Sequence, residues 1–523
     1  MLVGIGQIEF LTGDFDRNAS SIIDAIDEAR ARGCRLVVFP EFAVPGPLAG
    51  DLIRRPGFVD ACEDAVERIR QASRSLAVIV GSIGCSNDGT LRNRAIVIDD
   101  TTVVSRVDAA YVPPDGVLAG RRHFTPSPGT ETFDLGSRHL GVLLGEAIGS
   151  EDQPVDVLSS LGAEWIVQVA ASPFRIGTDS IRRRAGASCA REAGLPFLYV
   201  NGVGGIDRLV FDGGSFCVDP DGRLAVRAPR FTTGLTVFDI DRLSPIEPPE
   251  PNRLAEIRAA IVLGVRDYVR HNGFDQVVVG LSGGIDSSLV AALAVEALGA
   301  GSVCGVYLPC AHSSSTSASH AHTLASRLGI ELLEISAEGV HAALREALPF
   351  DARGVVDENL QARARAMLWM ALANERNALV LATGNKSESA VGYSTLYGDI
   401  TGALAPIADL YKTDVYRLAE TFASRIPRAI LERPPSAELR PNHRDEDDLP
   451  PYDVLDPLLE ALIDQNASRT DLIERGFDEH LVDDIVERFY TSEFKRAQSP
   501  LGLTLTDHPL GARRVPLTHA YRE

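Results

Sequence analysis

Residues 277–288 read VVVGLSGGIDSS, a run of β-branched residues that passes into a loop of glycines, hydroxyls and one carboxylate. The apolar stretch LVAALAVEALG follows at once, so we expect a strand, a tight loop and a helix N-terminus. Without Cβ atoms at Gly283 and Gly284, backbone N–H groups can close around phosphate oxygens. Three hydroxyls add further donors, those of Ser282, Ser287 and Ser288. The segment therefore predicts a phosphate site.

Asp286 is the one acidic residue in this loop. A carboxylate beside bound phosphates is explained if it holds Mg²⁺, which prefers carboxylate and phosphate oxygens. The loop is not a Walker A motif, because no Gly-Lys-Ser/Thr follows. It resembles the pyrophosphate loop of ATP pyrophosphatases, which implies ATP binding by Gly280, Leu281, Ser282, Gly283, Gly284, Ile285, Asp286, Ser287 and Ser288. The loop alone leaves open amide ligases, tRNA-thiolating enzymes, and GMP, asparagine or argininosuccinate synthetases.

Composition narrows these choices. The 523 residues carry a net charge of −21, which argues against a nucleic-acid or membrane-surface binder and lowers the tRNA-modifying alternative. No stretch reaches about 18 uninterrupted apolar residues and the start lacks a signal-peptide pattern, so we expect a cytoplasmic protein. The seven cysteines form no CxxC pair, which favours reduced thiols and no zinc site.

The chain contains only three lysines, Lys386, Lys412 and Lys495. Arginine provides the remaining basic side chains. A compact ammonium makes single-point contacts that a planar guanidinium cannot reproduce. We therefore expect the three lysines at chemically demanding positions.

The chain divides by pattern into two α/β regions. Residues 1–243 alternate short β-rich runs with amphipathic helical stretches. Residues 244–253 contain SPIEPPEPN, whose prolines predict a linker. Residues 254–523 form a second α/β region. Its segment 433–453 is polar, charged and rich in proline, and we expect it to be a surface loop that orders over a ligand.

Four motifs follow the phosphate loop: ENLQARARAML (358–368), the long segment 379–416 that contains TGNKSE, PPSAEL (434–439) and EFKRAQSP (493–500). Together with the loop they closely resemble the synthetase domain of NAD synthetases. The resemblance implies a doubly wound parallel sheet of the ATP-pyrophosphatase type. It also implies that Mg-ATP adenylates the nicotinate carboxylate of deamido-NAD and that ammonia displaces AMP.

The resemblance assigns roles to individual residues. Glu388 joins Asp286 as the second Mg²⁺ ligand, Thr383 contacts ATP, and Lys412 neutralises the α-phosphate as the adenylate forms. Deamido-NAD is expected to contact Asn359, Arg363, Arg365, Glu388, Tyr393, Ser394, Thr395, Leu396, Asp399 and Lys495. The family also pairs its synthetase domains, so we expect a homo-oligomer.

The N-terminal region resembles the nitrilase-like amidase domain with which glutamine-dependent members make ammonia, and an α-β-β-α sandwich is expected. FPEF (39–42), RRHF (121–124), ASPF (171–174) and NGVGGIDRLVFDGGS (201–215) match in order and spacing. Such domains use a cysteine nucleophile, a glutamate base and a lysine that steadies the oxyanion. Glu41 occupies the position of the base.

The other two groups are missing. The strand HLGVLL runs into Gly145 where the family has its cysteine, and the lysine position falls on Ala109. The tyrosine of the same family segment is replaced by Asp115, and a further basic residue by Thr178. No Cys occurs between 85 and 189 and no Lys before 386, so no shift of alignment restores them. We expect a domain that has kept its fold and lost its glutaminase chemistry.

The leading hypothesis is an NAD synthetase that uses free ammonia, or ammonia delivered by a separate amidotransferase. Two alternatives stay open. One is an adenylating amide ligase that acts on another carboxylate, and the other is a regulatory or scaffold protein. The retention of Asp286, Glu388, Lys412 and Lys495 argues against the scaffold.

Overall fold

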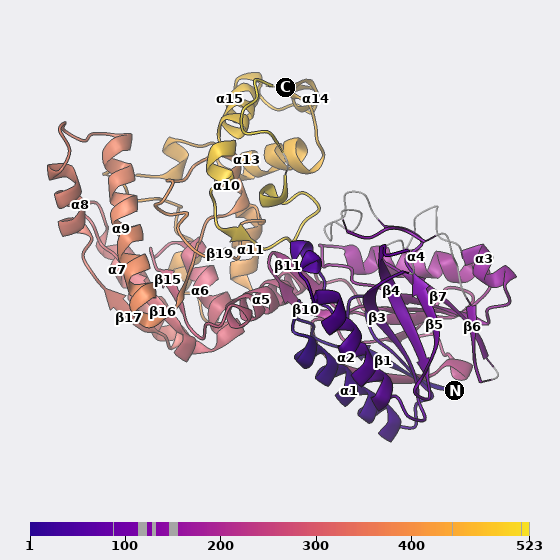
Figure 1. Ribbon diagram of the computed structural model, residues 1–523. Coiled ribbons are helices and arrows are strands. Elements are labelled where there is room, and N and C mark those ends of the chain that lie inside the picture. The colour runs from indigo at the N-terminus through magenta and orange to yellow at the C-terminus, as the bar shows by residue number, and fades with distance from the viewer. Residues whose placement is uncertain are drawn as a thin grey trace. The chain divides into compact units, whose positions relative to one another are not determined.

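The structure is a computed structural model that describes residues 1–86, 88–112, 123–127, 132–136, 138–145, 155–441, 443–513 and 515–521. The chain forms two compact units, Met1–Asn252 and Arg253–Glu523. Between 243 and 252 the backbone carries no helix or strand. Each unit is described separately below (Figure 1).

The first unit contains two six-stranded mixed sheets and a two-stranded hairpin. The first sheet has the order β14 (Gly234–Asp239), β1 (Leu2–Gln7), β2 (Leu36–Val38), β3 (Ala77–Cys85), β4 (Leu91–Asp99) and β5 (Thr102–Asp108). The second has the order β13 (Leu224–Arg227), β12 (Phe216–Val218), β9 (Phe197–Val200), β8 (Trp165–Val169), β7 (Arg138–Leu144) and β6 (Thr132–Leu135). The hairpin pairs β10 (Val203–Ile206) with β11 (Leu209–Asp212). In both sheets the central strands are parallel.

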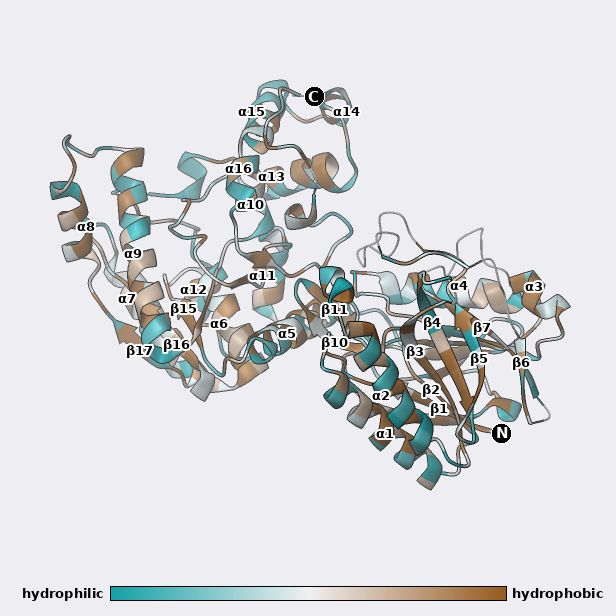
Figure 2. Cartoon of the chain, in the orientation of Figure 1, coloured by the Kyte–Doolittle hydropathy of each residue, from teal (hydrophilic) through white to brown (hydrophobic). Residues whose placement is uncertain are grey.

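Helices cover the outer faces of the two sheets. These are α1 (Phe15–Ala31), α2 (Phe58–Ala72), α3 (Val155–Ser160) and α4 (Thr178–Ala193). Strand β8 illustrates the layering, because neighbouring side chains of a strand point to opposite faces. Val167 joins the large apolar core that both sheets share, whereas Ile166 packs in the smaller cluster with Leu158 and Ala190 of the helices. The expected α-β-β-α sandwich is confirmed, and Figure 2 shows its apolar strands in brown.

The second unit is built on one six-stranded sheet whose paired strands are all parallel. Its order is β17 (Glu331–Glu334), β16 (Val303–Tyr307), β15 (Val277–Gly280), β18 (Leu379–Leu381), β19 (Leu404–Ala405) and β20 (Leu501–Gly502). Counted along the chain, this is the doubly wound order, in which successive strands are added on one side and then on the other. The expected fold of this region is confirmed.

The helices of this unit are α5 (Arg253–His271), α6 (Ile285–Leu298), α7 (Ser315–Leu328), α8 (Glu338–Glu346), α9 (Val355–Arg376), α10 (Lys386–Val391), α11 (Lys412–Glu420), α12 (Arg428–Leu431), α13 (Tyr452–Leu459), α14 (Arg469–Glu474), α15 (Glu479–Thr491) and α16 (Glu493–Arg496). Helix α6 is buried on nearly every side, as its apolar sequence requires. Helices α13 to α15 form a separate core with α10, through residues such as Val391, Leu459 and Phe489 (Figure 1).

Candidate active site

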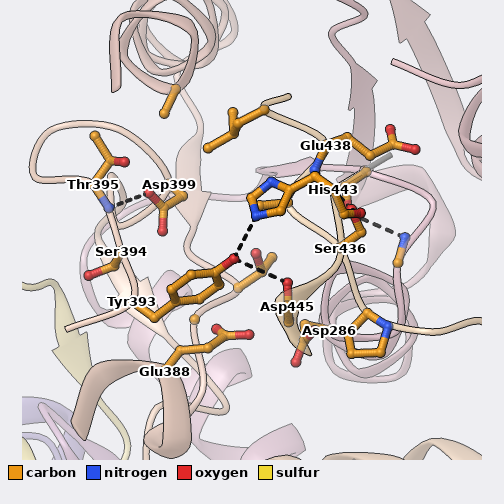
Figure 3. A pocket seen from close by; sticks show the side chains of 18 of the residues that line it. Asp286, Glu388, Tyr393, Ser394, Thr395, Asp399, Ser436, Glu438, His443 and Asp445 are labelled. Atoms are coloured by element: carbon orange, nitrogen blue, oxygen red, sulfur yellow. Dashed lines mark hydrogen bonds between the residues drawn. The ribbon is translucent and has the colours of Figure 1, made fainter. Parts of the chain in front are cut away.

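The strand order of the second unit reverses between β15 and β18. In open parallel sheets such a point leaves a crevice beyond the carboxyl ends of the strands, where ligands bind. A cavity of about 650 Å³ lies there, lined by Gly280 at the end of β15, Leu308 after β16 and Thr383 after β18. Figure 3 shows side chains from this cavity, among them Asp286 and Glu388.

The phosphate loop connects β15 to α6. Gly283 has φ +75°, and a Cβ there would lie 2.7 Å from the carbonyl oxygen of Ser317, so the turn admits only glycine. Gly284 caps α6 without a side-chain hydrogen bond to the first turn. The backbone N–H groups of that turn are thus available to an anionic ligand. Ser282 and Ser287, whose hydroxyls lie 3.1 Å apart, both line the cavity.

Two carboxylates from different helices meet on one lysine. Asp286 lies in the first turn of α6, and Glu388 lies in the first turn of α10, which follows β18. Lys412 Nζ donates to Asp286 Oδ2 at 2.5 Å and to Glu388 Oε1 at 3.1 Å. The lysine side chain is 1% exposed, whereas each carboxylate is 19% exposed on the cavity side. Residues up to 126 positions apart therefore form one charged cluster.

The cluster carries more negative charge than Lys412 neutralises. Burial raises the pKa of Glu388 to about 8, against the attraction of Lys412 and with repulsion from Asp286 and Asp445. Burial also raises the pKa of Asp445, a third carboxylate that lines the cavity. The carboxylates of Asp286 and Glu388 raise the pKa of Lys412 although its burial opposes this. Oxygen ligands with an excess of negative charge suit a divalent cation such as Mg²⁺.

Residues beside Glu388 hold it in place. Asn385 Nδ2 donates to Asp286 Oδ1 at 3.0 Å, and the Asn385 side-chain oxygen accepts from the Glu388 backbone N–H at 3.0 Å. Lys386 points away from the cavity. It is fully buried, and its Nζ lies 3.0 Å from Asp464 Oδ1 and 3.3 Å from Asp409 Oδ1. This lysine therefore anchors the TGNKSE segment, while Lys412 and Lys495 line the cavity.

The far end of the cavity is formed by α9 and the segment after α10. Thr395 donates through Oγ1 to Asn359 Oδ1 at 2.7 Å and through its backbone N–H to Asp399 Oδ1 at 2.6 Å. Lys495 Nζ donates to the carbonyls of Gly392 and Ser394, both at 2.7 Å. All of these residues line the cavity. Two helices and one loop are thereby tied together around a polar wall.

The first unit holds a second constellation of interest. Glu41 is 2% exposed, and its carboxylate accepts from Asn93 Nδ2 at 2.6 Å and from the backbone N–H of Ala171 at 2.8 Å. A Cβ built on Gly145 would lie 3.7 Å from Glu41 Oε1. The backbone N–H of Ala109 donates to the carbonyl of Asn93. The three positions singled out by sequence are thus neighbours. Asp115 lies outside the described residues.

Comparisons with known proteins agree for both units. The carbon-nitrogen hydrolase family matches residues 2–245, and the NAD synthase family matches residues 257–499. The glutamine-dependent NAD(+) synthetase of Acinetobacter baylyi is 36% identical, covering 99% of this chain and 98% of its own. That of Xylella fastidiosa strain 9a5c is 39% identical, covering 99% of both. The chain belongs to the family of glutamine-dependent NAD synthetases. The resemblance inferred from sequence is confirmed.

Solved structures of the family agree with this assignment. The glutamine-dependent NAD+ synthetase of Acinetobacter baumannii in complex with ADP is 33% identical, with a TM-score of 0.80, covering 99% of this chain and 98% of its own. A Cytophaga hutchinsonii synthetase, 21% identical with a TM-score of 0.86, shares the fold over 99% of this chain and 98% of its own. The chain is therefore a ligase of NAD synthesis, and ATP use is a property of its family.

Most of the residues predicted for the NAD synthetase site line one cavity. They are Gly280, Leu281, Ser282, Gly284, Ile285, Asp286, Ser287, Asn359, Arg365, Thr383, Glu388, Tyr393, Ser394, Thr395, Asp399, Lys412 and Lys495. Four predicted residues are not part of the lining: Gly283, Ser288, Arg363 and Leu396.

The conformation or the contacts of these four residues explain why they are not part of the cavity lining. Gly283 shapes the turn. The Ser288 hydroxyl is buried and donates to the carbonyl of Gly284 at 2.7 Å. Arg363 Nε donates to the carbonyl of Leu396 at 3.1 Å, so these two residues contact each other beside the cavity.

Sequence reasoning missed the individual contribution of the segment 433–448. Arg433 donates to Ser317 Oγ at 2.8 Å and Glu438 Oε1 at 2.7 Å, next to the phosphate loop. Figure 3 shows Tyr393 Oη beside His443 Nε2, at 3.1 Å. The proline-rich, charged composition predicts a loop that orders over a ligand, and residues of this segment do line the cavity. No spacing in the sequence could show which of its side chains turn inward.

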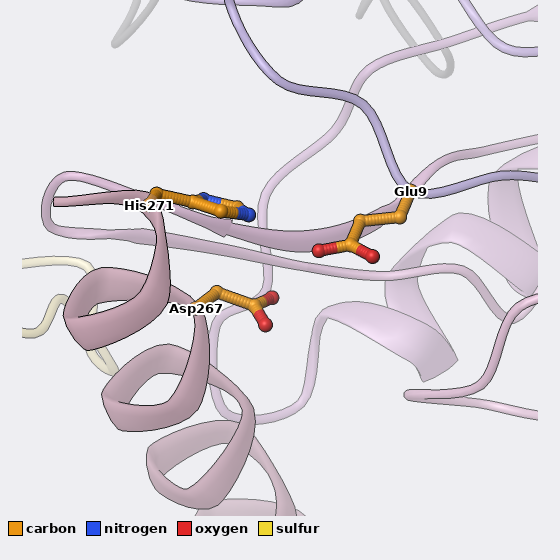
Figure 4. Close-up of side chains that lie close together, drawn as sticks. All are labelled: Glu9, Asp267 and His271. Atoms are coloured by element: carbon orange, nitrogen blue, oxygen red, sulfur yellow. The ribbon is translucent and has the colours of Figure 1, made fainter. Parts of the chain in front are cut away.

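Outside the cavity, Asp267 and His271 lie one turn apart near the end of α5 (Figure 4). Asp267 Oδ1 accepts from Arg266 Nε at 2.7 Å. Glu9, drawn in the same view, belongs to the other unit, and we assign no site that combines residues of both units. Across the described part of the chain, no helix is both long and apolar enough to cross a membrane.

Proposed function

We propose that this NAD synthetase amidates deamido-NAD through an acyl-adenylate and takes its nitrogen from ammonia rather than directly from glutamine. The observation that carries the first part is the meeting of Asp286, Glu388 and Lys412 at the switch point of the sheet, beside an uncapped helix N-terminus. In this proposal ATP lies with its phosphates on the loop Gly280–Ser287. Deamido-NAD lies along α9 and the segment 393–399.

Asp286 and Glu388 are the residues that would hold Mg²⁺ in this site. The fit rests on two hard oxygen ligands, on the burial and the repulsion from neighbouring carboxylates that raise the pKa of Glu388, and on the adjacent anion loop. A bound Mg²⁺ supplies charge neutralisation for the phosphates. Lys412 is held by the same carboxylates, so its ammonium is positioned before substrate arrives. It stabilises the charge that develops on the α-phosphate.

Ammonia use follows from the first unit. Glutamine hydrolysis by this fold needs a thiol, and Gly145 stands where the nucleophile should face Glu41. Ala109 leaves the oxyanion without its lysine. The relatives are named as glutamine-dependent enzymes, whereas Gly145 and Ala109 leave this chain without the thiol and the lysine that the reaction requires. Ammonia then comes from solution or from a separate amidotransferase in the cytoplasm.

The test is NAD formation by purified protein with ammonium and with glutamine, measured side by side. We expect NAD with ammonium, at a rate that rises through the mildly alkaline range because ammonia reacts unprotonated. We expect no glutamate from glutamine. Glutamate released in step with NAD would contradict the nitrogen assignment. Pyrophosphate release with aspartate or glutamate, but not with deamido-NAD, would contradict the substrate assignment.

A further inference from the structure

A cysteine, a histidine and an aspartate form a hydrogen-bonded chain beside the cavity. Cys310 follows β16, His341 lies on α8 and Asp357 lies in the first turn of α9. Cys310 Sγ is 3.8 Å from His341 Nδ1, and His341 Nε2 is 2.8 Å from Asp357 Oδ1. Cys310 and His341 are 7% and 6% exposed. None of the three has a role in the proposed synthesis of NAD.

The order of these groups defines their protonation. A carboxylate oxygen only accepts, so His341 Nε2 carries the proton and donates it to Asp357. His341 Nδ1 is then an acceptor that faces the thiol and can take its proton. Arg345 Nε also lies 3.5 Å from Asp357 Oδ1 and helps to hold the carboxylate in place.

Hydrogen bonds connect the backbone of Cys310 to the wall of the cavity. The backbone N–H of Cys310 donates to Ser313 Oγ at 3.0 Å, and the N–H of Ser313 donates back to the Cys310 carbonyl at 2.9 Å. Arg365 Nε donates to the carbonyl of Leu308, just before the same turn, at 3.1 Å. Leu308, Ser313 and Arg365 all line the cavity, whereas Cys310 lies just behind them. Because Cys310 is 7% exposed, enlargement of its side chain would press on the groups packed around it, and its backbone would carry that strain to this turn.

We propose that Cys310, His341 and Asp357 form an oxidation-sensitive thiol site that lowers substrate binding when a hydroperoxide modifies Cys310. The sulfur attacks one oxygen of the peroxide, the O–O bond breaks, and an S–O bond forms. His341 takes the thiol proton and passes it to the leaving alkoxide, or to hydroxide when the oxidant is hydrogen peroxide, which becomes an alcohol or water. The sulfur loses two electrons to the peroxide and is left as a sulfenic acid. The added oxygen pushes the Ser313 turn and Arg365 out of place.

The first test measures chemistry at sulfur and needs no activity. Protein in a C85S background, which removes the exposed cysteine, is treated with hydrogen peroxide, and sulfenic acid is captured with dimedone and located by mass spectrometry. Cys304 is the internal control, because it is also buried in this unit but its sulfur donates to the Gly305 carbonyl rather than to a histidine. We expect Cys310 to react at least about 10-fold faster than Cys304, and H341Q to lose about 10²-fold of that rate as expected for removal of a base.

Two further measurements test whether the variants fold and whether oxidation of Cys310 changes substrate binding in the cavity. D357N keeps the volume of the side chain and should also slow capture, with unchanged circular dichroism in both variants. Peroxide should weaken ATP and deamido-NAD binding in the C85S protein but not in C85S/C310S, and dithiothreitol should restore it. Equal reactivity of Cys310 and Cys304, or full reactivity in H341Q, would overturn the site. Unchanged substrate binding after complete oxidation of Cys310 would overturn its regulatory effect.

Discussion

The two units of this chain differ in how many of the catalytic residues expected from their families they contain. In the second unit Lys412 donates to both Asp286 and Glu388. In the first unit Glu41 is buried and hydrogen-bonded, but Gly145 stands beside it at the position where a cysteine nucleophile is expected. The difference shows that a fold does not depend on its chemistry, because the sandwich is held by an apolar core in which Ala109 packs and which includes neither Glu41 nor Gly145.

Removing the carboxylates of the second unit should give the largest effect. D286N and E388Q each keep volume but remove an anionic oxygen ligand, so we expect adenylate formation to be abolished while the fold persists. Pyrophosphate exchange with deamido-NAD measures this. E432Q is the matched control, because Glu432 is an exposed glutamate that pairs only with Arg428 among the ion pairs of the described residues. Near-normal exchange in either site variant would refute the metal assignment.

The second-largest effect on activity is expected from replacing Lys412 by arginine. In K412R the charge is kept, but a bulkier planar guanidinium cannot fit a position that is 1% exposed and bonded to two carboxylates. We expect turnover to fall by about 10²-fold, by analogy with the loss of one transition-state donor. R417K on the same helix is the control, since Arg417 is 66% exposed. Full activity of K412R in steady-state assays would show that the lysine is replaceable.

A third prediction places self-association in the second unit. Helix α9 exposes Met367 and Met370, one turn apart, and Val356 further along the same face. We expect a homodimer, and M367D/M370D should weaken it. Light scattering measures the change. I181D removes an equally exposed apolar side chain of the first unit and should leave the assembly intact. A fully active monomeric wild-type protein would contradict the prediction.

The smallest effect should come from restoring the lost nucleophile. Gly145 has φ +103°, where an L side chain is strained, so G145C should lower the free energy of unfolding by about 1–2 kcal/mol. It should leave the ammonium-dependent rate unchanged and release no glutamate, because Ala109 still provides no cation. Thermal unfolding and glutamate assays measure both outcomes. Glutaminase activity in G145C would show that the thiol alone was missing.

The sequence by itself determined the two-domain fold and the family, and it predicts that the glutaminase positions are vacant. These depend on local signals: the strand, glycine loop and helix around Asp286, and the order of motifs along each half. The absence of any lysine before Lys386 is also a property of the sequence alone. Such features need no knowledge of which distant residues meet.

Tertiary structure alone decided how the lysines differ and which side chains face the cavity. Lys386 and Lys412 both belong to distinctive motifs. Lys386 is buried in an ion pair with Asp464, whereas Lys412 bridges Asp286 and Glu388. Cys310, His341 and Asp357 come together because α8 and α9 pack beside the end of β16. Contacts between residues far apart in the chain depend on how strands and helices pack, and residue spacing in the sequence carries no record of that packing.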